Sequence, residues 1–349
     1  MALPVPAPAA APESATPACP HPDAQQHPLF AARDYISGDL FLIQRCAACG
    51  LVRTAPQPSA ETIADYYPRG YYGQGKRYSM PLERLLDWLY AFRGRLIEIA
   101  NGLEPGRVLD IGCGRGLLLH QLRKRGWEVT GTELTEASAS YARDVLRIDV
   151  KTGSLAELHL PDESYDTVIL WHVLEHIPDP AALLAEVARI LRPGGTLLVA
   201  VPNFGSLEAR WARDHWFHLD VPRHLNHFTT ASLRRMLAGA GLHPRMTSYF
   251  ASEYDFFSFV QSALNMLGIR HNLLYNLLRT RGAKVLAGRR QQAARPRDLA
   301  LTLLLTPGLG LISLAWAPLA ALLGQGATVT IYAKKPRQTS GQWSVVSDQ

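Results

Sequence analysis

Two patterns of apolar residues alternate along the middle of the chain. Short, nearly continuous apolar runs, such as residues 165–171, are typical of strands buried on both faces of a sheet. Between these runs, apolar residues recur at helical spacing, as in residues 183–191. Strands that alternate with helices predict an α/β fold with a mostly parallel sheet. The predicted strands are residues 107–111, 128–132, 148–150, 165–171, 196–201, 243–250 and 327–333.

Two further apolar segments lie outside this alternating region. Helical spacing through residues 81–101 predicts an amphipathic helix at the edge of the main domain. Residues 299–323 carry no charge and are long enough to span a bilayer, although two prolines and two glycines interrupt them. We therefore expect residues 251–326 to form a helical, apolar insertion before the last strand.

The composition predicts a mostly globular chain with short extensions. Of its 349 residues, 47% are hydrophobic and 19% charged, enough for one large domain with attachments or for two domains. Residues 1–18 lack the basic start and apolar run of a signal peptide, which predicts a disordered Ala/Pro-rich tail. The expected segments after it are a cysteine-containing part (19–55), a linker with the amphipathic helix (56–106), the core (107–250), the insertion (251–326), the last strand (327–335) and a flexible tail (336–349).

Charge and cysteine content narrow the expected partners and compartment. The net charge of +6 is mild, and no RNA-binding module is recognisable, so no nucleic-acid partner is expected. Four cysteines are too few for a secreted disulfide framework, which predicts a reducing, cytoplasmic compartment.

A glycine turn at residues 108–116, Val-Leu-Asp-Ile-Gly-Cys-Gly-Arg-Gly, joins a strand to a helix. Its glycines let the backbone approach a ligand, and the free N–H groups of the helix start favour negative charge. A bulky side chain at Gly112 or Gly114 is therefore expected to occupy ligand space. A dinucleotide fold would need G-x-G-x-x-G, but Leu117 stands where the last glycine is required. This spacing disfavours a nicotinamide-dependent oxidoreductase.

The turn and two later motifs resemble class I S-adenosylmethionine (SAM) methyltransferases. The motifs are Asp-x-Gly-x-Gly-x-Gly at 110–116, Val-Leu-Glu-His at 173–176 and Leu-Arg-Pro-Gly-Gly-Thr-Leu at 191–197. The resemblance implies SAM as cofactor and a doubly wound, seven-stranded Rossmann-like sheet whose last two strands form an antiparallel hairpin. It implies methyl transfer to an O or C, less readily an N, of a small-molecule or lipid-linked acceptor. A non-catalytic SAM-binding scaffold or membrane adaptor is the alternative.

Candidate cofactor residues follow from this resemblance. It places the methionine part of SAM on the turn and adenine near Gly153-Ser154-Leu155. Glu133 ends the second strand, where a carboxylate can accept both ribose hydroxyls. The candidate cofactor-binding residues are Asp110, Gly112, Cys113, Gly114, Gly116, Glu133, Gly153, Ser154, Leu155 and His172.

Histidines in two loops are candidate bases. The aromatic and His-rich loop 203–228 is expected at the acceptor site, with His224 as first candidate base and His176 as second. Proximity alone could also suffice, because the SAM sulfonium is already reactive. The H-x-x-E-H pattern at 172–176 resembles an inverted zinc peptidase motif, but the prolines that follow disfavour the long helix it needs. Ubiquinone-pathway O-methyltransferases carry a similar E-x-x-E-H that binds a divalent cation, so a metal there is a second alternative.

The N-terminal cysteines predict a structural zinc. Cys46-x-x-Cys49-Gly50 has the spacing of a thiolate knuckle, and the region resembles, in degraded form, the zinc ribbon that precedes some methyltransferases. The predicted ligands are Cys19, Cys46, Cys49 and a histidine, His21 or His27. Buried or free thiols without a metal are the alternative.

The insertion predicts contact with a membrane. Seven Lys and Arg residues between 279 and 297 precede the uncharged run, with Asp298 the one acid there. Basic charge beside an apolar segment favours anionic headgroups. We therefore expect a peripheral position on the inner face of a membrane; a soluble helical cap or a dimer interface is the alternative.

Overall fold

The computed structural model describes residues 25–337 except 60, 68–79, 103 and 279–294. The predicted tail 1–18 and residues 338–349 of the predicted tail 336–349 lie outside the described residues, as do Cys19 and His21.

The core is a seven-stranded sheet with the order β10-β11-β8-β7-β4-β5-β6. Strands β4, β5, β6, β7 and β8 run parallel to one another, whereas β11 runs antiparallel to both β8 and β10. This confirms the predicted α/β fold with its mostly parallel sheet. The strands are β4 (Arg107–Ile111), β5 (Glu128–Glu133), β6 (Asp149–Thr152), β7 (Tyr165–Trp171), β8 (Leu191–Pro202), β10 (His243–Ser248) and β11 (Thr328–Lys334).

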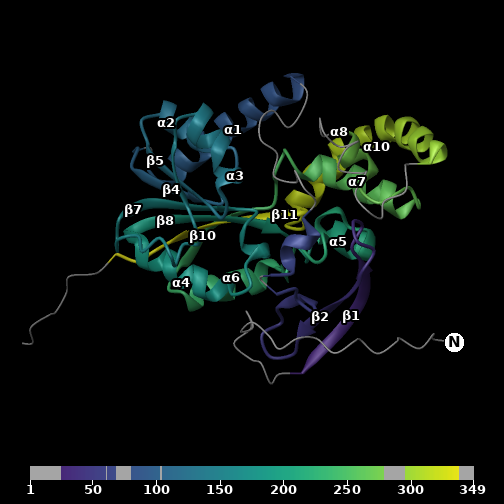
Figure 1. The fold of residues 1–349 in the computed structure, drawn as a ribbon, viewed down its shortest axis with the longest axis horizontal. Coiled ribbons are helices and arrows are strands. Elements are labelled where there is room, and N and C mark those ends of the chain that lie inside the picture. The colour runs from purple at the N-terminus through teal and green to yellow at the C-terminus, as the bar shows by residue number, and fades with distance from the viewer. Residues whose placement is uncertain (1–24, 60, 68–79, 103, 279–294, 338–349) are drawn as a thin grey trace, which may run out of the picture.

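Helices cover both faces of this sheet (Figure 1). On one face, Leu119 and Leu122 pack into a buried cluster with Val108 and Ile169 of the sheet. On the other face, Leu184 and Leu233 belong to the larger cluster. The helices are α1 (Met80–Ala100), α2 (Leu117–Lys124) and α3 (Glu136–Ser140) on the first face, and α4 (Pro180–Ile190) and α6 (Thr230–Gly239) on the second. Short helical turns lie at Ile63–Tyr66, Tyr141–Val145, Leu174–His176, Arg213–His215 and Phe217–Leu219.

The N-terminal region forms a second, antiparallel sheet. Strands β1 (Gln26–Arg33), β2 (Leu40–Cys46) and β3 (Val52–Ala55) continue into β9 (Asn226–His227), which belongs to the loop after β8. The Thr54 hydroxyl donates to the carbonyl oxygen of His224 over 2.7 Å. Asp34 forms an ion pair of 2.8 Å with Arg223, and both side chains are fully buried. The small sheet therefore holds the loop that carries His224.

We expect Asp34→Ala to destabilise the protein by about 3 kcal/mol, because it removes one partner of a buried ion pair. Asp220, which also pairs with Arg223, limits the loss. Urea denaturation measures the effect, with the nearby exposed Asp39→Ala as control. Equal stability of the two variants would contradict a stabilising role for this pair.

The insertion between β10 and β11 is helical. It contains α7 (Asp255–Met266), α8 (Leu273–Leu278) and α10 (Pro296–Leu322), which project from one end of the sheet (Figure 1). Helix α7 also packs on α5 (Leu207–Ala212), where the Ser262 hydroxyl donates to Glu208 over 2.8 Å. Among the described residues, α10 is the one helix long and apolar enough to cross a membrane.

Candidate functional site

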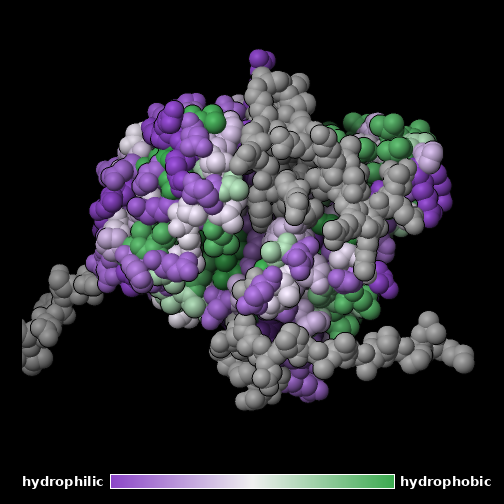
Figure 2. All heavy atoms as spheres, viewed as in Figure 1, coloured by the Kyte–Doolittle hydropathy of each residue, from purple (hydrophilic) through white to green (hydrophobic). Residues whose placement is uncertain are grey.

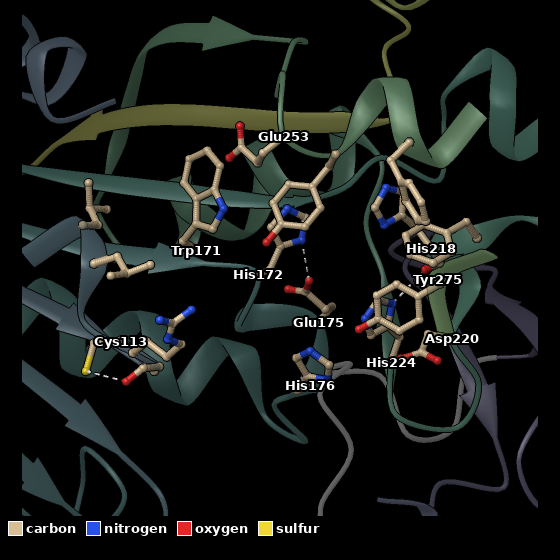
Figure 3. Close-up of a pocket in the computed structure, with 18 of the residues that line it drawn as sticks. Cys113, Trp171, His172, Glu175, His176, His218, Asp220, His224, Glu253 and Tyr275 are labelled. Atoms are coloured by element: carbon tan, nitrogen blue, oxygen red, sulfur yellow. Dashed lines mark hydrogen bonds and ion pairs between the residues drawn. The ribbon is translucent and has the colours of Figure 1, made fainter. Parts of the chain in front are cut away.

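A cavity of about 480 Å³ lies beyond the carboxyl ends of β4 and β7 (Figure 3). The strand order reverses between these two strands, which is where open α/β sheets bind their ligands. The glycine turn, the turn after β7, the loop 217–224 and the helices α1, α7 and α8 all contribute to its wall. Tyr35 of the small N-terminal sheet region also lines it.

Glycine is required at the three positions of the turn for different structural reasons. All three have positive φ angles, of 69° at Gly112, 54° at Gly114 and 68° at Gly116. A Cβ at Gly112 would lie 2.7 Å from Cγ2 of Val173, and one at Gly116 would lie 2.8 Å from Cβ of Ala142. A Cβ at Gly114 would have no atom of the described residues within 4 Å, and Gly114 lines the cavity. Gly114 therefore leaves room for a ligand, whereas the other two permit close packing of the chain.

This finding corrects the expectation about Gly112. A side chain there would first collide with Val173 in the turn after β7, before it reached ligand space. Gly112 still lines the cavity, so its backbone is accessible to a ligand.

Glu133 lies beside the glycine turn. Its Oε1 accepts a hydrogen bond of 2.6 Å from the Gly114 N–H. Burial raises the pKa of Glu133, and backbone hydrogen bonds oppose that shift. The carboxylate is therefore at the right end of β5 to meet a ribose, although it is not among the residues that line the cavity.

Replacing Glu133 with alanine should weaken SAM binding about tenfold or more, because two charge-assisted hydrogen bonds to the ribose would be lost. Isothermal titration calorimetry measures the change. Glu128→Ala, at the opposite end of β5, is the control. An unchanged affinity in Glu133→Ala would exclude the ribose role.

The other predicted cofactor residues divide into two groups. Asp110, Cys113 and His172 line the cavity. Burial, followed by repulsion from Glu133, raises the pKa of Asp110 to about 8, and burial also raises the pKa of the Cys113 thiol. By contrast, Gly116, Gly153, Ser154 and Leu155 lie outside the lining. The Ser154 hydroxyl donates to Glu157 over 2.7 Å, and Leu155 packs in the larger core cluster.

Arg93 is a cavity residue that the sequence analysis missed. It is buried, its Cζ lies 3.4 Å from the centroid of a Trp171 ring, and it forms an ion pair with Glu253. The sequence pattern of α1 indicates only a packing helix. A signal was nevertheless present, since Arg93 falls at helical spacing between Leu89 and Leu96 on the apolar side of that helix.

Glu175 lies at the centre of a group of histidines (Figure 3). Its Oε1 is 3.1 Å from Nδ1 of His172, and the residue is only 1% exposed. Burial alone would raise the pKa of Glu175, but the hydrogen bond from His172 and the nearby imidazoles lower it to about 2. The Glu175 carboxyl is therefore ionised at neutral pH, and it lines the cavity. The His172 backbone adopts a positive φ of 54°, which brings the His172 ring to 4.4 Å from that of Tyr254.

Hydrogen bonds fix the tautomers of His176 and His224. Nδ1 of His176 is 2.9 Å from the carbonyl oxygen of Arg223, and Nδ1 of His224 is 2.8 Å from that of His218. A carbonyl oxygen only accepts, so each Nδ1 carries the proton, and the neutral ring keeps an acceptor at Nε2. Burial lowers the pKa of His224 to about 4, so its ring is neutral at pH 7.

The structure brings the two candidate bases together. Their rings are 4.7 Å apart, and one potential ligand atom from each of Glu175, His176 and His224 lies within 4.8 Å of the others. One carboxylate oxygen of Glu175 has no hydrogen-bond partner among the described residues. Glu175, His176 and His224 could take a proton from the molecule that is methylated. Two imidazoles with a carboxylate also suit a divalent metal ion. This group therefore fits either alternative left open by the sequence.

The predicted zinc ligands are only partly within the described residues. Cys46 is buried at the end of β2, and the turn to Cys49 closes with a 2.9 Å hydrogen bond from the Gly50 N–H to the Cys46 carbonyl. His27 lies in β1 beside Arg45 of β2. No cluster of three metal ligands forms around these cysteines among the residues that the structure describes. Cys19 and His21 lie outside that part, so the zinc site stays a prediction.

Elemental analysis of protein purified without chelator should find about one zinc per chain, as expected of a closed structural site. Cys46→Ser and Cys49→Ser should lose it, whereas Cys113→Ser, at the cavity, should retain it. If protein without zinc has the same melting temperature as the purified protein, the zinc site is rejected.

Comparison with known proteins agrees with this geometry. Residues 82–245 match a family described as a methyltransferase domain. A ubiquinone biosynthesis O-methyltransferase of Alkalilimnicola ehrlichii is 39% identical over 112 residues, which cover 30% of this chain and 45% of that protein. A "Probable S-adenosylmethionine-dependent methyltransferase" of Mycolicibacterium smegmatis is 36% identical over 145 residues, covering 41% of this chain and 54% of that protein. The chain thus spans about half the length of these curated relatives.

A SAM-dependent methyltransferase from Archaeoglobus fulgidus superposes with a TM-score of 0.45 and 21% identity, covering 71% of this chain and 94% of that one. The family match spans α1 to β10, including the glycine turn and the Glu175–His176 turn. Residues 82–245 of this chain are a SAM-dependent methyltransferase domain.

Proposed function

We propose that the protein transfers the methyl group of SAM to a nucleophilic oxygen or carbon of a small, partly apolar acceptor. One observation carries the proposal: Gly114 and the neighbouring pair His176 and His224 line the same cavity, and His224 is buried. Donor and acceptor can thus lie in one enclosed space, with a proton acceptor beside them.

The chemistry follows from this arrangement. The acceptor oxygen or carbon attacks the methyl carbon in line with the departing sulfur, so a bond to carbon forms as the sulfonium bond breaks. When bound, SAM would supply the methyl group, and S-adenosylhomocysteine with its neutral sulfur would be the leaving group. Nε2 of His224 takes the acceptor's proton, and the ionised Glu175 stabilises the resulting imidazolium. Holding the reactants in this geometry supplies most of the acceleration.

The relatives favour oxygen as the first acceptor atom to test. The named activity of the Alkalilimnicola protein is O-methylation in ubiquinone biosynthesis. The aromatic wall of the cavity, including Tyr35, Phe217, Phe257 and Tyr275, suits an acceptor with a flat or apolar body. A hydroxyl on such an acceptor would be within reach of the histidine pair.

Incubation with methyl-labelled SAM and cell extract tests the proposal. The extract is separated into lipid, polar-metabolite and macromolecule fractions. We expect label in a lipid or small-molecule fraction with wild-type protein. Tight SAM binding without transfer to any fraction would instead support the non-catalytic scaffold.

A further inference from the structure

Helix α10 exposes an unusually large apolar surface. Among its residues, Leu303, Leu304 and Leu311 are 73%, 74% and 71% exposed, and Leu322 is 86% exposed. Only 11% of the most apolar 18-residue stretch of this helix is buried. In Figure 2 this surface is visible as a green area around the upper end of the insertion. Contiguous apolar surface of this kind marks an interaction site.

One side of α10 is already occupied by the rest of the insertion. The Trp316 and Phe259 rings are 5.4 Å apart, and Leu301, Leu305 and Leu309 pack against the α7–α8 cluster. The exposed Leu303, Leu304 and Leu311 therefore point away from this cluster.

The side-chain hydroxyls within α10 are satisfied by the helix itself. The hydroxyls of Thr302, Thr306 and Ser313 donate to the carbonyls of Asp298, Thr302 and Gly310 over 2.7, 2.6 and 2.7 Å. In hydrocarbon, every polar group must find such an internal partner because water is absent. The helix surface thus suits lipid without desolvating an unpaired hydroxyl.

Charge distinguishes a bilayer from a second copy of the chain. Arg295 and Arg297 begin the helix, and the sequence before them adds Arg279, Arg281, Lys284, Arg289 and Arg290. Between Leu299 and Leu323 no charge occurs. Anionic headgroups complement the basic end, whereas a second copy would present the same positive charge.

The connections of α10 decide its orientation. Strand β11 begins at Thr328, a few residues after the helix, and pairs with β8 in the core. The elements before and after α10 therefore belong to one folded unit and must lie on the same side of a membrane. A helix that crossed the bilayer would separate β11 from its sheet, so α10 fits a position along the membrane surface.

The same helical unit walls the cavity. Phe257 of α7 and Tyr275 and Leu278 of α8 line it, while α10 packs on both helices. We propose, on the basis of the proposed methyl transfer, that α10 lies in the surface of an anionic bilayer and that the acceptor is a lipid-linked molecule taken from it. The protein is then a peripheral enzyme, and the helical unit that carries α10 also forms part of its cavity wall.

Flotation with liposomes tests the docking surface. The full-length protein is mixed with vesicles of phosphatidylcholine containing phosphatidylglycerol, or of phosphatidylcholine alone. Wild-type protein should float with the anionic vesicles, and the variant Leu304→Glu/Leu311→Glu should float at least tenfold less. The control Ile99→Glu/Val145→Glu adds the same charge at positions that are 56% and 59% exposed, far along the sequence from α10. It should float like the wild type.

The outcomes separate this inference from the proposed function. Calorimetry should give the same SAM affinity for all three proteins, which shows that they are folded. Flotation without methyl transfer would support the membrane-binding surface and contradict the proposed activity. Equal flotation of the two double variants would overturn the membrane proposal. So would a wild-type protein that does not float but forms a dimer, seen by size-exclusion chromatography, that Leu304→Glu/Leu311→Glu loses.

Discussion

Replacing Gly114 with leucine should abolish SAM binding while the protein stays folded. The added Cβ would meet no atom of the described residues within 4 Å, so the side chain would extend into the cavity and occupy the space of the cofactor. Its φ of 54° adds strain of about 1–2 kcal/mol, which a folded domain tolerates. Calorimetry with SAM and with S-adenosylhomocysteine measures the loss.

Gly241 provides a matched control for this substitution. It also has a positive φ, of 74°, and an added Cβ there would again have no described atom within 4 Å, but Gly241 follows α6 and does not line the cavity. Gly241→Leu should therefore suffer similar backbone strain and keep wild-type affinity. Wild-type affinity in Gly114→Leu would show that the cofactor does not lie against this turn.

Replacing His224 with alanine should lower kcat by about 10²- to 10⁴-fold, the usual contribution of a positioned general base. SAM affinity should change little, because the proposed function places the acceptor rather than SAM beside this ring. Since the pKa of His224 in the folded protein is about 4, the ring is deprotonated above about pH 5. The rate should therefore fall only as the pH drops through about 4. Stopped assays of the labelled product across pH measure both effects.

The control and a chelator separate the roles of His224. His215→Ala removes a histidine from the same loop that is 43% exposed in its side chain, and it should leave kcat unchanged. An unchanged rate in His224→Ala would return the role to His176 or to proximity. Loss of wild-type activity on chelation, restored by a divalent cation, would identify Glu175, His176 and His224 as metal ligands instead.

The sequence predicted the central sheet well because its signals are local. The apolar run of β7 has the same bounds in the structure as in the sequence analysis. The start of β8 was placed too late, at Thr196, whereas the strand begins at Leu191. Arg192-Pro193-Gly194-Gly195 reads locally as a turn, but Tyr165 of β7 pairs with Leu191 across it.

The assembly of the cavity was less accessible from the sequence. Pairing of β3 with β9 joins residues far apart in the chain, and no local pattern specifies it. For the same reason, Arg93 and Tyr35 were not recognised as cavity residues. The sequence did single out His176 and His224, but their shared environment around Glu175 depends on backbone carbonyls supplied by the fold.

A crystal structure of the protein with S-adenosylhomocysteine tests the central claim most directly. We predict the homocysteine part against Gly114, the ribose hydroxyls on Glu133, and the sulfur facing the part of the cavity that holds His176 and His224. Density for the ligand elsewhere, or with its sulfur directed away from the histidine pair, would contradict the proposed site.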